Sequence, residues 1–330
     1  MKIFLIGEAG EHRDDLLPHL NVAAEVISLP WSAADTTTFD SKIADDDIVV
    51  SLRFSRPAGA PRFRMLHVPG AGLDQIHIGE LSPETVVCNV FEHEGPIGEF
   101  VVARLLEWEI RAGELQHGFG ADAWPQMYRN RRPHGELADK TLLLVGYGRI
   151  GRSIAARAHA FGVNVIAVDD SAVSDDHASV LPINQLDRLQ QQTDYLVLAC
   201  PLTPDTEGLI DEHALERLPA HAVLVNVSRA PIVSEVALYA ALRDNQIGGA
   251  ILDVWYRYPT PENPEIPPAG VPLWELPNAW CTPHSSAWTT ELPRRRYAVI
   301  ADNINRLTEG QPLRNVVRAA GDNAQRGARK

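Results

Sequence analysis

The chain has 330 residues, which is long for a single hydrophobic core and favours two domains. A net charge of −13 argues against nucleic acid or an anionic membrane as a partner, and no apolar run approaches the length of a membrane span. Three cysteines lie far apart in apolar runs and show no metal-ligand spacing. This pattern favours a reducing, cytoplasmic compartment and predicts no metal site.

The first part of the chain alternates between short apolar runs and turn-rich or helical pieces. Buried strands are predicted at residues 2–7, 47–54, 63–68 and 84–90. A helical pattern then extends from 97 to 118. Strands that alternate with helices predict a parallel sheet covered on both faces.

A second strand–helix series begins at Thr141, after a loop that holds Trp124 and an arginine run. Its predicted strands are 141–146, 163–170, 194–200, 222–228 and 248–254. The proline-rich stretch 259–278 is interpreted as a surface loop, and a last helix is expected from Thr289 to Glu309. The polar tail after Gly310 is expected to fray.

The stretch "TLLLVGYGRIGRSIAARAHAFG" places Gly146, Gly148 and Gly151 between a strand and a helix. The first glycine allows a tight turn, the second a close approach to a pyrophosphate, and the third close packing of helix on strand. Asp169 ends the next strand, where a carboxylate accepts from the ribose hydroxyls and repels a 2′-phosphate. The set predicts a dinucleotide site and favours NAD over NADP.

From about residue 45 to 310 the chain resembles the D-isomer-specific 2-hydroxyacid dehydrogenases. The matching stretches include "VPGAGLDQI", "LADKTLLLVGYGRIGR", "PLTPDTEGLI", "LVNVSRAPIV", "GGAILDVW" and "TPHSSAWT". The resemblance implies an α/β fold of two Rossmann-like domains with parallel sheets and an active site in the cleft between them. A flavodoxin-like substrate domain would comprise 1–97 plus 290–330, and an NAD-binding Rossmann domain 98–289. A homodimer through the NAD-binding domains is also implied, with segment 118–133 as the arm that crosses to the partner.

The resemblance carries roles over to particular residues of this sequence. Arg229 would bind the carboxylate and keto oxygen of a small carboxylic acid, which suits the fixed fork of a guanidinium. His284 would be the general acid/base, for which its neutral-range titration is suited. Ala71 and Gly72 would donate backbone N–H groups to the substrate carboxylate, and Asp253 would meet the nicotinamide amide.

Further positions follow from the same match. Arg53 ends a strand of the substrate domain and could reach the same cleft, although a solvent-facing role is an equal alternative. The cofactor cleft would also be lined by Arg149, Ile150, Cys200, Pro201, Thr206, Val227, Ser228 and Ser286.

Two positions depart from the family pattern. Where a glutamate normally contacts the histidine, this chain has Tyr258, which can orient the ring but supplies no negative charge near pH 7. Where an asparagine commonly faces the active site, it has His93, between Glu92 and Glu94. His93 is either a second contributor to substrate binding or proton transfer, or a loop histidine among solvated acids. Glu262 or Glu265 could also fold back toward His284.

Three functions remain open at this stage. The first is an NAD-dependent oxidoreductase that interconverts a small D-2-hydroxy acid and its 2-oxo acid. The second is hydride transfer from a small oxyanion such as formate or phosphite, because an uncharged partner for the histidine is found in the formate dehydrogenase branch. The third is a non-catalytic sensor of NAD(H), like the corepressors that share this fold.

Overall fold

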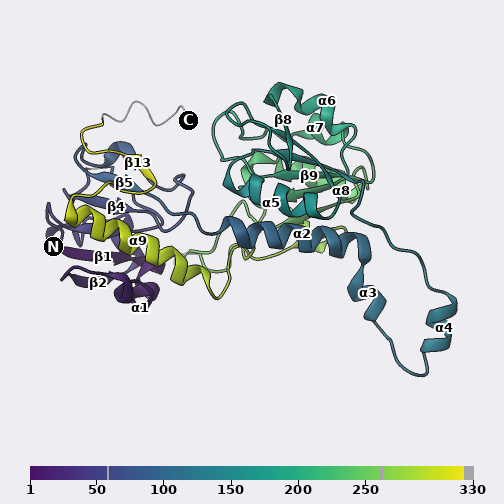
Figure 1. Ribbon diagram of the computed structural model, residues 1–330, viewed down its shortest axis with the longest axis horizontal. Helices are drawn as coiled ribbons and strands as arrows, with labels where there is room; N and C mark the ends of the chain where they lie inside the picture. Colours follow the sequence, from purple (N-terminus) through teal and green to yellow (C-terminus); the bar gives the residue numbers. More distant parts are fainter. Residues whose placement is uncertain (58, 261–262, 323–330) are drawn as a thin grey trace. The chain divides into compact units, whose positions relative to one another are not determined.

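The computed structural model describes residues 1–57, 59–260 and 263–322, which fall into two compact units (Figure 1). One unit consists of Met1–Glu92 with Thr289–Lys330, and the other of His93–Trp288. These divisions lie slightly earlier in the chain than the expected boundaries after 97 and 289. The reason is local: helix α2 begins at Glu94, before the expected boundary, and packs against α5 of the second unit.

The first unit is a sheet with short helices in its connections. Its strands are β1 (Lys2–Ile6), β2 (Glu25–Leu29), β3 (Ile48–Val50), β4 (Met65–His67), β5 (Val86–Cys88) and β13 (Val316–Arg318). Its α-helices are α1 (Arg13–Leu16) and α9 (Leu292–Glu309). Its 3₁₀ turns are η1 (Gly7–His12), η2 (Leu17–His19), η3 (Trp31–Ala34), η4 (Asp40–Lys42) and η5 (Ile78–Glu80).

Within the described residues, the strand order of this unit is β13-β5-β4-β3-β1-β2. All neighbours pair in parallel except β13, which runs antiparallel to β5. The order β2-β1-β3-β4-β5 is that of flavodoxin-like sheets. Side chains of β1 alternate between two cores, with Phe4 and Ile6 on one face and Ile3 and Leu5 on the other, as the period of a strand requires.

Two pieces from the end of the sequence complete the first unit. Figure 1 shows α9 lying along the sheet, and its Tyr297, Ile300 and Ile304 pack with Ile3 and Leu5 in one core. The tail does not simply fray after Gly310, as expected, because 316–318 form β13. Arg318 holds this strand by donating to the carbonyl oxygens of Ile78, Ser82 and Thr85 at 2.7–2.9 Å.

The second unit is a larger sheet with helices on both faces. Its strands are β6 (Thr141–Val145), β7 (Asn164–Val168), β8 (Ser179–Leu181), β9 (Tyr195–Leu198), β10 (Val223–Asn226), β11 (Gly249–Leu252) and β12 (Ala279–Cys281). Its α-helices are α2 (Glu94–Ile110), α3 (Ala112–Gln116), α4 (Trp124–Arg129), α5 (Arg149–Ala160), α6 (Leu186–Gln190), α7 (Glu212–Glu216) and α8 (Glu235–Arg243). Its 3₁₀ turns are η6 (Ile183–Gln185), η7 (Ala230–Ile232) and η8 (Leu273–Glu275).

The seven strands described in this unit all run parallel, in the order β12-β11-β10-β9-β6-β7-β8. Leu143 and Val145 of β6 face the core under α7 and α8, and Leu142 and Leu144 face the core under α2 and α5. The order reverses between β6 and β9, which is the switch point where open α/β sheets bind ligands. The predicted class, two α/β units with parallel sheets, is therefore confirmed.

The helix expected over 97–118 is interrupted. Arg111 adopts a left-handed conformation (φ 55°, ψ 44°) that ends α2, and its guanidinium lies 4.2 Å from the centre of the Trp108 ring. The chain then enters an excursion that carries α3 and α4 and projects from the end of α2 (Figure 1). Its large apolar side chains are 48–62% exposed: Leu115, Phe119, Trp124 and Tyr128.

A buried histidine lies between the sheet and α9 of the first unit. The Nε2 atom of His67 is 3.0 Å from the side-chain Nδ2 of Asn303, whose amide orientation is fixed by two bonds to the backbone of Arg314. Because Nδ2 can only donate, Nε2 accepts and the imidazole is neutral. Burial lowers the pKa of His67 to about 4.

This burial makes the first unit sensitive to acid. An unfolded chain protonates His67 below about pH 6.5 while the folded chain resists until about pH 4, so stability present above pH 6.5 is lost as the pH falls. We expect a loss of roughly 3 kcal/mol by pH 4 from this group. Urea unfolding between pH 7.5 and 4.5 measures it. His67→Gln, which does not titrate, should flatten the dependence, and equal slopes in both proteins would contradict the assignment.

Candidate active site

The three glycines after β6 meet different surroundings, which separates their roles. Gly146 has a φ of +96°, and a Cβ there would lie 2.6 Å from the backbone nitrogen of Cys200. A Cβ on Gly151 would lie 2.3 Å from the carbonyl oxygen of Gly146. At Gly148, the residue that precedes α5, a Cβ would meet nothing within 4 Å. Gly146 and Gly151 are thus required by close packing. Gly148 leaves open space beside the first N–H groups of α5, near Arg149 and Ile150.

The acid at the end of β7 is fastened to this glycine loop. Asp169 accepts a hydrogen bond from the Tyr147 backbone N–H at 2.8 Å and from the Ser171 N–H and hydroxyl at 2.8 and 2.7 Å. Burial opposes ionisation of Asp169, but these hydrogen bonds outweigh it and lower the pKa of the carboxyl below its ordinary value. Asp169 is therefore an anion at neutral pH, with lone pairs left for further donors.

A hollow of about 450 Å³ opens next to Asp169. Asp169 and Asp170 contribute acids to it, and Val173, Val180 and Leu181 contribute apolar surface. None of the residues that line it is basic. Its apolar lining and its acids offer contacts of the kind that the adenosine end of a dinucleotide uses.

The turns after β9 and β10 are tied together. The Ser228 hydroxyl donates to the carbonyl oxygen of Cys200, and the Thr206 hydroxyl donates to that of Pro201 at 2.7 Å. Burial raises the pKa of the Cys200 thiol to about 11, so the thiol is uncharged at neutral pH. Val227 beside them is buried.

Arg229 follows β10 in a turn held by Asn226, a residue that the sequence analysis did not single out. Asn226, which is buried, donates from Nδ2 to the Arg229 carbonyl at 3.0 Å and accepts from the Ser228 N–H at 3.1 Å. The guanidinium of Arg229 donates to the Ser228 carbonyl at 2.9 Å. The signal for Asn226 was available, because a lone amide at the end of an apolar strand needs buried partners.

His284 lies in a turn that a buried carboxylate organises. Asp253, which follows β11, accepts from the Thr282 hydroxyl at 2.6 Å and from the backbone N–H groups of Ser285 and Ser286 at 2.8 and 2.9 Å. His284 itself has a left-handed φ of 56°, a conformation that costs energy for a residue with a Cβ. One of these hydrogen bonds comes from before His284 and two come from after it, and together they hold its backbone conformation in place.

Tyr258 does contact the histidine. Its phenol oxygen is 2.9 Å from Nδ1 of His284 and accepts from the Trp255 backbone N–H at 3.1 Å. The indole N–H of Trp255 donates to the Thr282 carbonyl at 2.8 Å. Trp255 therefore fastens both the tyrosine and the histidine turn, which sequence reasoning missed. Glu265 is exposed, and Glu262 lies outside the described residues.

The remaining predicted residues are distributed over both units. Ala71 and Gly72 follow β4 in the first unit, and the Ala71 carbonyl accepts from Asn89 at 3.0 Å. Arg53 follows β3 and pairs with Asp35. His93 is buried and directly precedes α2. Its flanking acids pair with arginines, Glu92 with Arg295 and Glu94 with Arg149, both at 3.7 Å.

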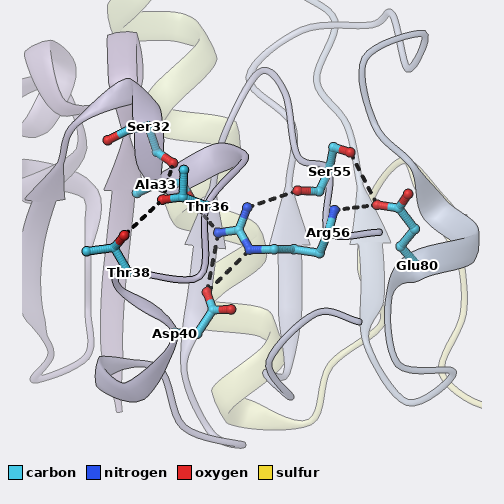
Figure 2. A network of polar contacts seen from close by, with 8 residues as sticks. All are labelled: Ser32, Ala33, Thr36, Thr38, Asp40, Ser55, Arg56 and Glu80. Atoms are coloured by element: carbon cyan, nitrogen blue, oxygen red, sulfur yellow. Dashed lines mark hydrogen bonds and ion pairs between the residues drawn. The ribbon is translucent and has the colours of Figure 1, made fainter. Parts of the chain in front are cut away.

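The loop after β3 is anchored by a buried arginine that the sequence analysis did not mark. Arg56 donates to the carbonyl oxygens of Ala33 and Ser55 and pairs with Asp40 at 3.3 Å, while its own N–H donates to Glu80 (Figure 2). The guanidinium of Arg56 is buried and paired inside the unit, so it is not accessible to a ligand. Its contacts hold the loop that carries Arg53.

The described residues contain no cluster of three or more side chains that could hold a metal ion. No helix in the described part of the chain is both long and apolar enough to cross a membrane. Because the strands of the second unit are parallel, the residues after β6, β7, β9, β10 and β11 share one edge of its sheet. The glycine loop, Asp169 and the hollow beside it define a dinucleotide-binding domain.

The comparisons with known proteins agree. The model of the NAD-binding domain of D-isomer-specific 2-hydroxyacid dehydrogenases matches residues 102–286, more than half of the chain. The chain belongs to this family, as its motifs predict.

Two relatives and one structure illustrate the match. Glyoxylate reductase of Korarchaeum cryptofilum is 30% identical over 289 residues, 84% of each chain. D-3-phosphoglycerate dehydrogenase of Methanocaldococcus jannaschii is 28% identical over 285 residues, 84% of this chain and 52% of the relative, so this chain spans about half of that protein's length. The crystal structure of an NADPH-dependent glyoxylate/hydroxypyruvate reductase from Sinorhizobium meliloti, 24% identical, superposes with a TM-score of 0.75 over 97% of this chain and 99% of that one.

Proposed function

We propose that this chain is an NAD-dependent oxidoreductase that interconverts a small D-2-hydroxy acid and its 2-oxo acid. The observation that carries the proposal is the position of His284. Asp253 and Trp255 hold its turn at the edge of the sheet where the glycine loop also lies. Membership of the family and a relative named glyoxylate reductase support a short substrate.

Each residue has a defined task in this proposal. Bound NAD(H) supplies or accepts the hydride. The Arg229 guanidinium binds the substrate carboxylate and polarises the keto oxygen, and Ala71 and Gly72 offer N–H groups to the same carboxylate. His284 gives a proton to that oxygen in reduction and takes it back in oxidation. His93 contributes a further polar contact to the substrate.

The cofactor preference rests on charge. Asp169 is an anion, Asp170 lies beside it, and no basic residue lines the hollow. A 2′-phosphate would meet repulsion there, so NAD is favoured over NADP. The structural relative named as NADPH-dependent shares the fold at 24% identity, which leaves room for a different ribose contact.

A panel of substrates tests the function. We expect NADH to be consumed with glyoxylate or hydroxypyruvate, measured by the loss of absorbance at the nicotinamide band. The same assay in reverse offers D-glycerate, formate and phosphite to NAD. Reduction of NAD by formate or phosphite alone would replace the proposal with the second candidate, which the uncharged Tyr258 favours. Tight NADH binding without turnover would point to a sensor.

The Tyr258–His284 pair predicts the pH profile. A neutral phenol does not stabilise the imidazolium, so 2-oxo acid reduction should weaken at a lower pH than with a glutamate partner. Tyr258→Glu should raise the upper pH limit of kcat by about one unit, because a carboxylate within 4–6 Å favours the protonated ring. Tyr256→Phe is the matched control, since its phenol donates to Val233 and not to the histidine. A profile unchanged in Tyr258→Glu would refute the pairing.

We propose that the partner is a second copy of the chain, bound through the excursion that carries α3 and α4. Its exposed Phe119 and Trp124 are unusual for a surface that stays in water. Sedimentation at micromolar concentration should give a dimer, and Phe119→Ser with Trp124→Ser should shift it toward monomer. A wild-type monomer would contradict the proposal.

A further inference from the structure

The middle residue of the glycine loop is held at both of its ends. The backbone N–H of Tyr147 donates to Asp169, and its phenol donates to Asp175 at 2.7 Å. The ring is only 1% exposed and packs in the core beneath α5. Tyr147 therefore links the glycine loop to both Asp169 and Asp175.

Asp175 gathers contacts from three segments. Its carboxylate accepts from Tyr147, from the Arg152 guanidinium at 2.8 Å, and from the backbone N–H groups of His177 and Ala178 at 2.9 and 3.2 Å. Hydrogen bonding from Tyr147 lowers the pKa of Asp175, although burial opposes it, so the group is an anion at neutral pH. One carboxylate therefore joins the glycine loop, α5 and the segment after β7.

That segment is the wall of the hollow beside Asp169. Ala172, Val173 and Ser174 line the hollow directly, and the Ser174 hydroxyl accepts from the backbone N–H of Val180, another lining residue, at 2.9 Å. Asp175 is next in the chain, so the Tyr147–Asp175 bond ties this wall to the glycine loop. The pyrophosphate end and the ribose end of the site are thereby kept in one fixed relation.

Asp175 also forms an ion pair with Arg152. The guanidinium lies 4.5 Å from the centre of the Tyr147 ring and is paired with the Asp175 carboxylate. A site that accepts a 2′-phosphate commonly uses an arginine near the ribose. Here the arginine of the adjoining helix is already neutralised by a carboxylate.

We propose that Asp175 is a specificity-determining positioning residue for the cofactor, which fixes the ribose wall through Tyr147 and withholds Arg152 from a 2′-phosphate. The inference rests on the proposed NAD preference and deepens it. Asp169 is the acid that meets the ribose, and Asp175 acts through other residues. No contact between Asp175 and the cofactor is required.

Direct binding of NADH and NADPH, followed by nicotinamide fluorescence, separates the two effects. Asp175→Asn keeps an acceptor oxygen for Tyr147 and the backbone but removes the charge that pairs Arg152. We expect the ratio of the NADPH Kd to the NADH Kd to fall about tenfold, mainly through tighter NADPH binding, as expected for one new charge-assisted contact. Tyr147→Phe removes only the hydrogen bond from the phenol to Asp175. It should weaken the binding of NADH and NADPH about fivefold each, with the ratio of the two Kd values unchanged.

Tyr195→Phe is the matched control. It removes another phenol–carboxylate bond of the same unit, to Glu109, away from the hollow, and should leave both Kd values at the wild-type level. Thermal unfolding confirms that each variant is folded. Wild-type Kd ratios in both Asp175→Asn and Tyr147→Phe, with no loss of affinity in either, would overturn this inference while the NAD preference stands. A wild-type chain that binds NADPH more tightly than NADH would instead overturn the NAD preference and this inference with it.

Discussion

The parallel direction of the strands in the second unit is the constraint on which its site depends. Every strand has its carboxyl end at the same edge, so the turns that follow β6, β7, β10 and β11 all lie along that edge of the sheet. Buried polar groups then fix each turn: Asn226 for Arg229, and Asp253 for the strained residue His284. In the proposed function the exposed or half-exposed residues Arg229 and His284 carry the chemistry, and buried residues fix their geometry.

In the proposed acid/base unit, Tyr258 stands where the family pattern has a glutamate. A tyrosine in place of a carboxylate keeps contact with Nδ1 because Trp255 supplies its phenol with a donor. The phenol retains both a proton to give and a lone pair to offer, so it accommodates either tautomer of the ring. Tyr258 can therefore orient the His284 ring as a carboxylate would. It does not supply the negative charge that would stabilise the protonated ring.

Sequence reasoning located the central strands, the glycine loop and the family motifs because each leaves a local pattern. It missed β2, β8, β12 and β13, and all four are edge strands. An edge strand is only partly covered, so it lacks the continuous apolar run by which a central parallel strand is recognised. Arg56, Trp255 and Asp175 escaped for another reason: their partners are distant in sequence or are backbone atoms, which no residue pattern records.

The first unit is assembled from both ends of the chain, and this affects the order in which the protein can fold during synthesis. The second unit is continuous from His93 to Trp288, so every strand of its sheet has been made before α9 exists. Until α9 emerges, the face of the first sheet formed by Ile3, Leu5 and Val50 is covered only by the short segment around Leu16 and lacks the side chains of α9. The nascent chain therefore carries a partly uncovered apolar surface during the time in which the second unit is synthesised and folds. Aggregation through this surface is most favoured in that interval.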